Sequence, residues 1–434
     1  MKTRIAVQTV VLIAALCVTA DADDFVARSL GATVLNPAMP ESDVRLVIRN
    51  AEPQASFVIP AGASWTLKKT LMIPHGIGIY GQHPGGGGGC EPTFIKGFNG
   101  PLAFVSSFVT LQGVTFDGNK KAGFTGDGVV AVGEKRKRWN KPGSATGDVR
   151  ELRMIRVDIS NNAGDGYVMS AHHYYSHFEF VGFDHNDGYG LVYGEVRAHH
   201  TDNVFNSCHW GWNKKGGVAF HGVEASSIWE NCEFFHNGGA AFEHFLINKK
   251  RGAGKPIGPS PSSGAGALVI RNTVIRNCPG PVWLNRGGKC ESIVFQDCRL
   301  KHNGDPKDSH HTKDSGKSAA ELFGLTAPVG GIFHVERGQL FAEIRGGFAW
   351  DNTGYMFTAT RESTPGSRLT IGGAAAAGHV TGGVYAPTGL LTVQDASLLQ
   401  DDAHIHVQSG VGLDPRKGGI VKYGPAPAPP PAAE

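Results

Sequence analysis

The sequence predicts an all-β protein folded as a parallel β-helix, a solenoid in which the chain winds into stacked coils. First, one segment pattern recurs: an alternating apolar run, an asparagine, a glycine turn and a second alternating run. Second, apolar and polar residues alternate with the period of two that strands require. Third, glycine makes up 61 of the 434 residues without a collagen-like period, which indicates frequent turns and disfavours a mainly helical fold.

The repeat is defined by its asparagines. The anchors Asn162, Asn186, Asn213 and Asn237 are separated by 24, 27 and 24 residues. Asn303 lies 66 residues further on, which fits two more coils with inserted loops. Coils of about two dozen residues, made of short strands, are typical of a parallel β-helix. We expect the anchor amides to hydrogen-bond from coil to coil.

Positions around the anchors fall into columns. Five residues before an anchor stand Val157, Val181, Cys208, Cys232 and Cys298, and three before stand Ile159, Phe183, Trp210, Phe234 and Leu300. Between them lie Asp158, Gly182, His209, Glu233 and Arg299. The apolar columns should therefore point inward and the column between them outward. The cysteines at equal positions on neighbouring coils form either a buried thiol stack or a coil-to-coil disulfide.

Segments outside the repeat complete the predicted domain organisation. Residues 1–22, with Lys2 and Arg4 before an apolar run and small residues at the cleavage site, read as a signal peptide, so export to the periplasm or the extracellular space is expected. Residues 23–54 are a cap segment whose stretch 41–51 forms a short amphipathic helix begun by Ser42. Residues 55–423 are the β-helix, and 424–434 are a Pro/Ala-rich tail without a core.

The composition narrows the class of partner. A net charge of +3 over 434 residues argues against a uniformly basic nucleic-acid binder. Beyond the signal peptide, no apolar run reaches the length of a membrane helix, so membrane insertion is not expected. The sequence does not define the oligomeric state.

The first coils resemble a known family. The segment FVIPAGASWTLKKTLMIPHGIGIYGQ, residues 57–82, resembles the opening of pectate-lyase-like β-helix proteins, and the repeats agree with that resemblance to about residue 410. The resemblance implies a right-handed, single-stranded parallel β-helix and a carbohydrate-active protein. That superfamily contains polysaccharide lyases, epimerases, glycoside hydrolases and adhesin or phage fibres, and the fold does not decide among them.

Two basic insertions predict the substrate. They follow the strand after the glycine turn, at residues 133–147 and 248–266. Their basic residues include Lys135, Arg136, Arg138, Lys249, Lys250 and Arg251. Inserted loops on one side of a solenoid become walls of a binding face, and two basic walls favour a polyanion such as an acidic polysaccharide. The three coils between them span about 20 Å, enough for a few sugar units.

The turns between those loops supply the predicted catalytic groups and, with His172, Tyr174 and His221, predicted substrate-binding groups. They are His172, His173, Tyr174, Tyr175, Glu195, Arg197, His199, His200, His221 and Glu224. His173, Arg197 and Glu224 each follow an anchor by eleven residues and should stack on consecutive coils. This arrangement suits β-elimination from a uronate, with Arg197 neutralising the carboxylate. His173, His199 or His200 would act as base and Tyr175 or Tyr174 would protonate the leaving oxygen.

Other activities stay open at this stage. An epimerase would use the same groups, and a hydrolase would need paired carboxylates from Glu195, Glu224 and Glu243. The chain lacks the Gly-His-Gly signature of polygalacturonase-type hydrolases and the Asp-Pro-His-Asp motif of mannuronan epimerases, and the coils from Asn162 to Asn303 contain no Asp-Asp signature. A non-catalytic polysaccharide-binding protein or adhesin would use the same His, Tyr and Arg residues to contact sugars.

Calcium is a possible cofactor. Asp127 and Asp165 lie in matching Gly-Asp-Gly turns, and Asp187 follows on the next coil. Carboxylate oxygens suit calcium, and the pectate lyases that the chain resembles bind it through surface acids. The competing interpretation, which we favour, is that these aspartates accept hydrogen bonds from the turn backbone.

Taken together, the basic insertions and the polar turns lead us to expect a lyase for an acidic polysaccharide, with a hydrolase or epimerase second and a binding protein third.

Overall fold

The computed structural model describes residues 31–82, 91–133, 147–194, 199–221, 223–245, 266–327, 329–350, 352–360, 363, 367–372, 376–377, 382–385, 391–394 and 412–413. The predicted signal peptide and the C-terminal tail lie outside these residues, so the domain boundaries stay predictions. No helix in the described ranges combines the length and the apolar character needed to cross a membrane.

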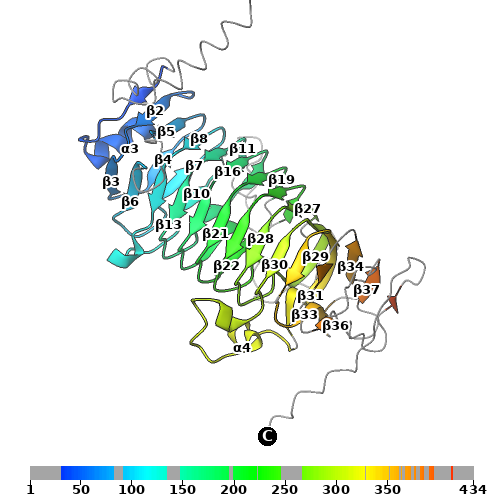
Figure 1. Cartoon of the computed structure of the whole chain (residues 1–434). Helices are drawn as coiled ribbons and strands as arrows, with labels where there is room; N and C mark the ends of the chain where they lie inside the picture. The colour runs from blue at the N-terminus through cyan, green and yellow to red at the C-terminus, as the bar shows by residue number, and fades with distance from the viewer. Residues whose placement is uncertain are drawn as a thin grey trace, which may run out of the picture.

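The chain is a right-handed parallel β-helix, as predicted (Figure 1). A complete coil contributes four short strands, so the strands stack into four rows, named here row 1 to row 4. On one coil these are β14 (Tyr167–Met169), β15 (His172–Tyr174), β16 (His177–Glu179) and β17 (Gly182–Asp184). Each strand pairs in parallel with its equivalents on the neighbouring coils.

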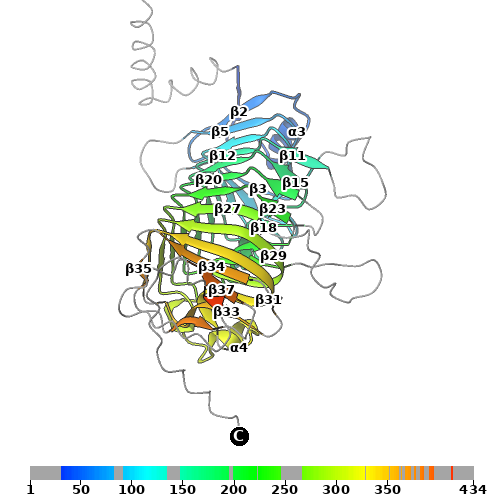
Figure 2. The same cartoon turned by 90° about the vertical axis from the view of Figure 1, so that its right-hand side faces the viewer.

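The rows extend along most of the solenoid, and Figure 2 looks onto row 3 from β2 to β37. Row 1 also contains β4 (Leu71–Ile73), β7 (Ala103–Val105), β10 (Val129–Ala131), β18 (Tyr189–Tyr193), β22 (Gly216–Phe220), β26 (Phe242–His244), the first parts of β29 (Trp283–Gln296) and β31 (Gly330–Arg345), β33 (Tyr355–Ala359) and β36 (Gly382–Tyr385). Row 2 adds β11 (Asp148–Arg150), β19 (His199–Thr201) and β23 (Val223–Ala225).

The remaining two rows complete the coils. Row 3 adds β1 (Thr33–Val34), β2 (Ser56–Ile59), β5 (Gly78–Gly81), β8 (Thr110–Gln112), β12 (Arg153–Ile155), β20 (Val204–Asn206), β24 (Ile228–Glu230), β27 (Gly266–Arg271), the ends of β29 and β31, β34 (Ser367–Gly372), β37 (Leu391–Gln394) and β38 (Gly412–Leu413). Row 4 adds β3 (Ser64–Leu67), β6 (Thr93–Lys96), β9 (Thr115–Asp117), β13 (Asp158–Ser160), β21 (His209–Gly211), β25 (Glu233–Phe235), β28 (Val274–Arg276), β30 (Arg299–Lys301), β32 (Phe348–Trp350) and β35 (Ala376–Ala377).

Single residues in the left-handed conformation turn the corners between rows 2, 3 and 4 and beyond row 4. On one coil these are Tyr175, Phe180 and His185, with φ of 55°, 53° and 57°. The same positions are left-handed on the next coils, for example Trp212 and His236. This conformation costs a residue with a side chain about 1 to 2 kcal/mol, so interactions between stacked coils must offset it.

The asparagine ladder is one such interaction, and the prediction of coil-to-coil amide bonds is confirmed. The side-chain amide of Asn162 donates to Oδ1 of Asn186 at 2.9 Å, Asn186 to Asn213 at 2.9 Å, and Asn213 to Asn237 at 3.0 Å. All four side chains are fully buried. On the following coil Cys278 takes the anchor position, which explains the gap before Asn303.

Aromatic and thiol side chains fill the interior in stacked columns. Phe178 and Phe205 have ring centroids 4.5 Å apart, and Phe205 and Trp229 are 4.1 Å apart. Cys208 and Cys232 are buried and free. The interpretation as a buried thiol stack is therefore confirmed, and the alternative of a disulfide between these coils is wrong.

A short helix covers the N-terminal end of the solenoid, as predicted (Figure 1). The helix α3 (Glu41–Arg49) buries Val44 and Ile48 against the first coil. The expectation that Ser42 begins the helix is wrong. The helix begins one residue earlier, after Pro40, and the Ser42 hydroxyl donates to the side chain of Asp43 instead of capping the helix.

The ladder makes a testable prediction about stability. We expect Asn213→Ala to lower the free energy of unfolding by about 2 to 3 kcal/mol, because it leaves the buried N–H groups of Asn186 and the carbonyl of Phe183 without a partner. The control Asn206→Ala removes an exposed amide bond from the same coil and should change stability by about 0.5 kcal/mol or less. Urea unfolding of both variants measures this, and equal losses would contradict the role of the ladder.

Candidate functional site

The predicted stack of His173, Arg197 and Glu224 is wrong in register. His173 pairs with His200, and His200 pairs with Glu224. The coil between Asn186 and Asn213 has 27 residues, whereas the coil before it has 24. The three extra residues precede β19, so the position equivalent to His173 moves from Arg197 to His200.

His173 and His200 are core residues, not members of an accessible edge as the sequence predicted. Both side chains are fully buried. His173 shares hydrogen bonds with the Tyr167 hydroxyl at 3.0 Å and with Oδ1 of Asn203 at 3.2 Å, and burial lowers its pKa to about 4. His200 contacts the carbonyl of Gly194 at 3.3 Å. Neither imidazole can reach a substrate, so neither residue has a catalytic role.

The structure describes only some of the other residues that were predicted for this edge. His172 and Tyr174 point outward with their rings parallel and 6.1 Å apart, and Tyr175 is 59% exposed at its corner. For His199 and Glu224 the structure describes only the backbone, on β19 and β23. The rest lie outside the described residues: Glu195, Arg197, Lys135, Arg136, Arg138, Lys249, Lys250 and Arg251.

The outward face of row 1 carries a different cluster, centred on Glu243. Val192, Ala219 and Glu243 occupy one register on successive coils, so a carboxylate stands where the preceding coils have apolar residues. The Glu243 side chain is 6% exposed. The Tyr189 hydroxyl donates to its Oε2 at 2.7 Å, and Nε of Arg286 donates to its Oε1 at 2.5 Å. Both carboxylate oxygens thus hold a donor in place.

Burial and charge define the protonation states in this cluster. Burial raises the pKa of Glu243, opposed by Arg286 and by the Tyr189 hydroxyl. Burial and the neighbouring carboxylate raise the pKa of Tyr189 far above its ordinary value, so the phenol keeps its proton. The ammonium of the exposed Lys215 lies 5.9 Å from the Tyr189 ring centroid. Tyr189 is therefore a proton donor beside a cation.

His221, a predicted substrate-binding residue, adds a neutral imidazole. It directly follows β22, one coil before Phe245, and its ring meets the Phe245 ring edge-on at 5.3 Å. Burial lowers its pKa to about 4, and His244 and Lys215 add to the effect. Strand geometry places its Cα about 8 Å from that of Glu243.

Sequence reasoning found Glu243 and His221 but missed Tyr189, Lys215 and Arg286. Tyr189 and Lys215 belong to the glycine turns of the repeat, where the pattern suggested turn formation and no chemistry. Arg286 lies on the coil whose anchor is Cys278, so the asparagine pattern gave no register for it. The residues in register with Glu243 are Val192, Ala219 and Leu284, so counting along the repeat could not have connected it with these three.

A second polar cluster lies on the outward face of row 4. Asp184 accepts hydrogen bonds from the backbone N–H of Gly211 at 2.6 Å and from Nε2 of His209 at 2.7 Å. Burial and the charge of Asp184 raise the pKa of Asp158 to about 6. A Cβ atom at Gly182 would lie 2.8 Å from His209 and 3.0 Å from Asp158, so this glycine lets the three side chains approach. A substantial fraction of Asp158 therefore carries a proton slightly below neutral pH.

The calcium candidates have protein partners. Asp127 accepts from the backbone N–H of Asp165 at 2.9 Å, and Asp165 accepts from that of Tyr189 at 2.8 Å, so the interpretation as turn acceptors is confirmed. Asp187 pairs with Lys120 at 2.8 Å and Lys214 at 2.9 Å. Within the described ranges, no three His, Cys, Asp or Glu side chains are grouped so that they could hold a metal ion.

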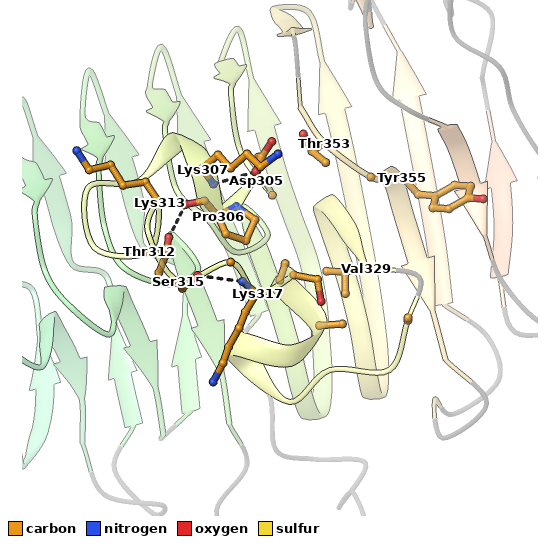
Figure 3. Close-up of a pocket in the computed structure, with 17 residues that line it drawn as sticks. Asp305, Pro306, Lys307, Thr312, Lys313, Ser315, Lys317, Val329, Thr353 and Tyr355 are labelled. Atoms are coloured by element: carbon orange, nitrogen blue, oxygen red, sulfur yellow. Dashed lines mark hydrogen bonds between the residues drawn. The ribbon is translucent and has the colours of Figure 1, made fainter. Parts of the chain in front are cut away.

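A pocket of about 600 Å³ lies between the segment after β30 and the turn before β33 (Figure 3). Ala319, Ala320 and Val329 contribute to its lining. The ammonium groups of Lys313 and Lys317 project away from it (Figure 3). Polar residues, among them Asp305, Lys307 and Thr353, also contribute to its lining.

Comparisons with known proteins support the fold. No family model matches the chain, and no curated protein matches it in sequence. The catalytic unit of an α-1,3-glucanase from Streptomyces thermodiastaticus matches with a TM-score of 0.50 and 11% identity, over 84% of this chain and 67% of that one. The A-module of a mannuronan C-5 epimerase from Azotobacter vinelandii gives a TM-score of 0.49 and 13% identity, over 88% and 99%.

Two further matches have lower TM-scores. An alginate lyase from Paenibacillus sp. gives a TM-score of 0.43 with 10% identity, over 83% of this chain and 98% of that one. A protein of Geobacillus virus E2 gives 0.41 with 11% identity over 64% of this chain, which spans 57% of the length of that protein. At 11% identity, the match with a TM-score of 0.50 shows a shared parallel β-helix fold and nothing beyond it.

The row 4 cluster predicts how stability depends on pH. The pKa of Asp158 is higher in the folded protein than the usual 3.8 of an unfolded aspartate, so its contribution to stability is present below about pH 4 and is lost as pH rises through 6. We expect Asp158→Asn to remove this dependence and to be more stable than wild type at pH 7, on the order of 2 kcal/mol. Urea unfolding between about pH 4 and pH 7 measures the difference between the two proteins. Parallel curves would contradict the assignment.

Proposed function

We propose that the protein cleaves an acidic, uronate-containing polysaccharide by β-elimination on the outward face of row 1. One observation carries the proposal: Glu243 fixes a protonated phenol and a guanidinium through both of its carboxylate oxygens. Lys215 and the neutral His221 lie beside this group. The set supplies a cation for the substrate carboxylate, a base and an acid, which are the groups that elimination requires.

Each group has a role in the reaction. Lys215 pairs with the uronate carboxylate and thereby acidifies the proton on the adjacent C5. His221 removes that proton, the electron pair forms the C4–C5 double bond, and the bond from C4 to its glycosidic oxygen breaks. Tyr189 donates its proton to the departing oxygen and regains one from solvent. Glu243 and Arg286 position the phenol through the hydrogen bonds described above.

The basic insertions support an anionic substrate. Residues 133–147 follow β10 and residues 248–266 follow β26, so both insertions leave row 1 at the same ends of its strands. The catalytic candidates lie on the coils between and next to these two strands. The basic composition of these insertions, together with Lys215 and Arg286, favours a polyanion. The apolar run of residues 1–22 supports export, and an exported protein could meet an extracellular polysaccharide.

Hydrolysis is a second candidate function, favoured by the row 4 cluster. Asp158 and Asp184 lie on adjacent coils, two residues apart in register, which puts their Cα atoms about 8 Å apart. A glycosidase requires two carboxyl groups about 5 to 9.5 Å apart. A raised pKa, as at Asp158, suits the general acid of such a pair. The fold match to an α-1,3-glucanase is compatible with a polysaccharide as the class of substrate.

The lyase proposal predicts the effects of substitutions in row 1. Tyr189→Phe and His221→Ala should each reduce kcat/KM on a polyuronate about 100-fold or more, because they remove the acid and the base. The control Tyr174→Phe removes a phenol from row 2 and should leave the rate unchanged. The ultraviolet absorbance of the new conjugated double bond measures the rate on alginate, pectate and glucuronan. Equal rates for Tyr189→Phe and Tyr174→Phe would contradict the assignment.

The pH profile tests the base separately. Because the pKa of His221 is about 4, the imidazole is unprotonated above that value, and wild-type kcat/KM should fall only as pH drops through about 4. A base with an ordinary histidine pKa would give a fall near pH 6.5.

The hydrolase alternative predicts a different product and a different sensitive residue. Hydrolysis would shorten the polysaccharide and create reducing ends without any double bond. Asp184→Asn should then abolish activity, since it removes one of the two carboxylates, whereas Tyr189→Phe should have no effect. Reducing-end and absorbance assays on the same samples separate the two reactions.

A further inference from the structure

The turns that lead from row 4 into row 1 expose charge of one sign. In the described turns between β3 and β26, every exposed Lys, Arg, Asp or Glu side chain is a lysine: Lys68, Lys69, Lys121, Lys214 and Lys215. We name these residues the lysine edge. The strands β3 and β21, which precede its first and last members, are separated by five steps in the stacking order of row 4. At the usual strand spacing the lysine edge extends about 24 Å along the solenoid axis.

The acidic residues of the same turns are occupied by protein donors. Asp127 and Asp165 are partly buried and accept hydrogen bonds from the turn backbone. Asp187 accepts from Lys120 at 2.8 Å and from Lys214 at 2.9 Å. Burial would raise the pKa of Asp187, but the hydrogen bonds from both lysines lower it, so the carboxylate is ionised. One carboxylate is thus shared between two ammonium groups, and the exposed charge of these turns stays positive.

Two imidazoles beside the lysine edge are affected by this charge. Burial lowers the pKa of His185, and Lys120 and Lys121 lower it further against one opposing carboxylate. Burial also lowers the pKa of His311, and the charges of Lys214 and Lys120 add to the effect. Both imidazoles are therefore neutral at pH 7, so the lysines supply the positive charge of this surface.

The lysine edge borders the catalytic cluster. Lys215 directly precedes β22, and its ammonium lies 5.9 Å from the ring centroid of Tyr189. Row 1 begins at these turns, so a polymer that follows the lysine edge passes the proposed acid. Lysine is a hydrated point charge without the fixed bidentate geometry of arginine, which suits a row of carboxylates that has no fixed register.

We propose that the lysine edge binds an acidic polysaccharide along the solenoid axis and holds it beside Lys215 and Tyr189. This inference rests on the proposed function for the chemical class of the polymer. A row of ammonium groups attracts repeated carboxylates, raises the rate of association and weakens with added salt. The lysine edge therefore contributes to binding of long chains without taking part in the chemical step.

Binding of fluorescently labelled pectate and alginate tests the proposal apart from cleavage. Measurements in the Tyr189→Phe background keep the polymers intact. In that background, Lys69→Glu with Lys121→Glu changes two exposed positions outside the catalytic cluster and should raise Kd about 10-fold at low salt. The difference should shrink at about 0.5 M salt, because mobile ions screen exposed charges. Fluorescence anisotropy of the labelled polymers measures Kd.

A matched control separates the lysine edge from net charge. Arg153→Glu with Arg156→Glu makes the same change in net charge at exposed positions of row 3 and its corner. It should change Kd by less than about 2-fold, because these positions lie outside the lysine edge. With Tyr189 intact, the lysine pair should raise KM on the long polymers and leave kcat unchanged.

The contradicting outcomes are distinct. Equal Kd values for the lysine pair and the arginine pair would overturn the inference, and the proposed lyase would stand if wild type forms double bonds. If wild type forms none but the lysine pair alone loses polyuronate binding, the proposed function is wrong and the binding surface stands. Duplex DNA is the competing polyanion. If it binds more tightly than either polyuronate and the lysine pair weakens only DNA binding, the partner is a nucleic acid and the inference is wrong.

Discussion

The stacking of one coil on the next is the interaction on which the rest of this structure depends. Each coil turns its corners with single residues in the left-handed conformation, which are locally unfavourable. Parallel pairing, the buried asparagine amides and the aromatic columns offset that cost, and all of them require a neighbouring coil at the same register. A change in coil length is therefore tolerated only where it leaves the four rows aligned, in a turn between strands.

That constraint explains why the sequence predicts the fold well and the site poorly. The inward columns repeat on every coil, so the anchors, the apolar positions and the coil-to-coil amides could be predicted from spacing. The catalytic edge could not, because its prediction counted eleven residues from each anchor across a turn of variable length. Three extra residues before β19 moved Arg197 out of the column and placed His200, a buried residue, at the expected position.

Polarity was also a misleading guide to exposure. From the sequence, His173 and His200 were expected at the surface. In the structure both are buried, and His173 shares hydrogen bonds with Asn203 and Tyr167 in the core. Glu243, by contrast, was among the predicted residues. Its role in the cluster depends on neighbours that the spacing of the repeat does not connect with it. Its partners Tyr189 and Arg286 lie 54 and 43 residues away along the chain and meet it only because the coils stack. In a solenoid, sites combine single residues from several coils, so register has to be known before chemistry can be inferred.

The position of Glu243 follows from the same packing. An outward position on row 1 is apolar on the preceding coils, and a carboxylate is costly there unless it is paired. Two donors satisfy it, and one of them, Arg286, also binds the carbonyl of Phe323. A buried carboxylate with both oxygens occupied holds its donors more rigidly than a solvated one, because few alternative partners are available. The cost of burying Glu243 is therefore linked to the fixed orientation of Tyr189 and Arg286.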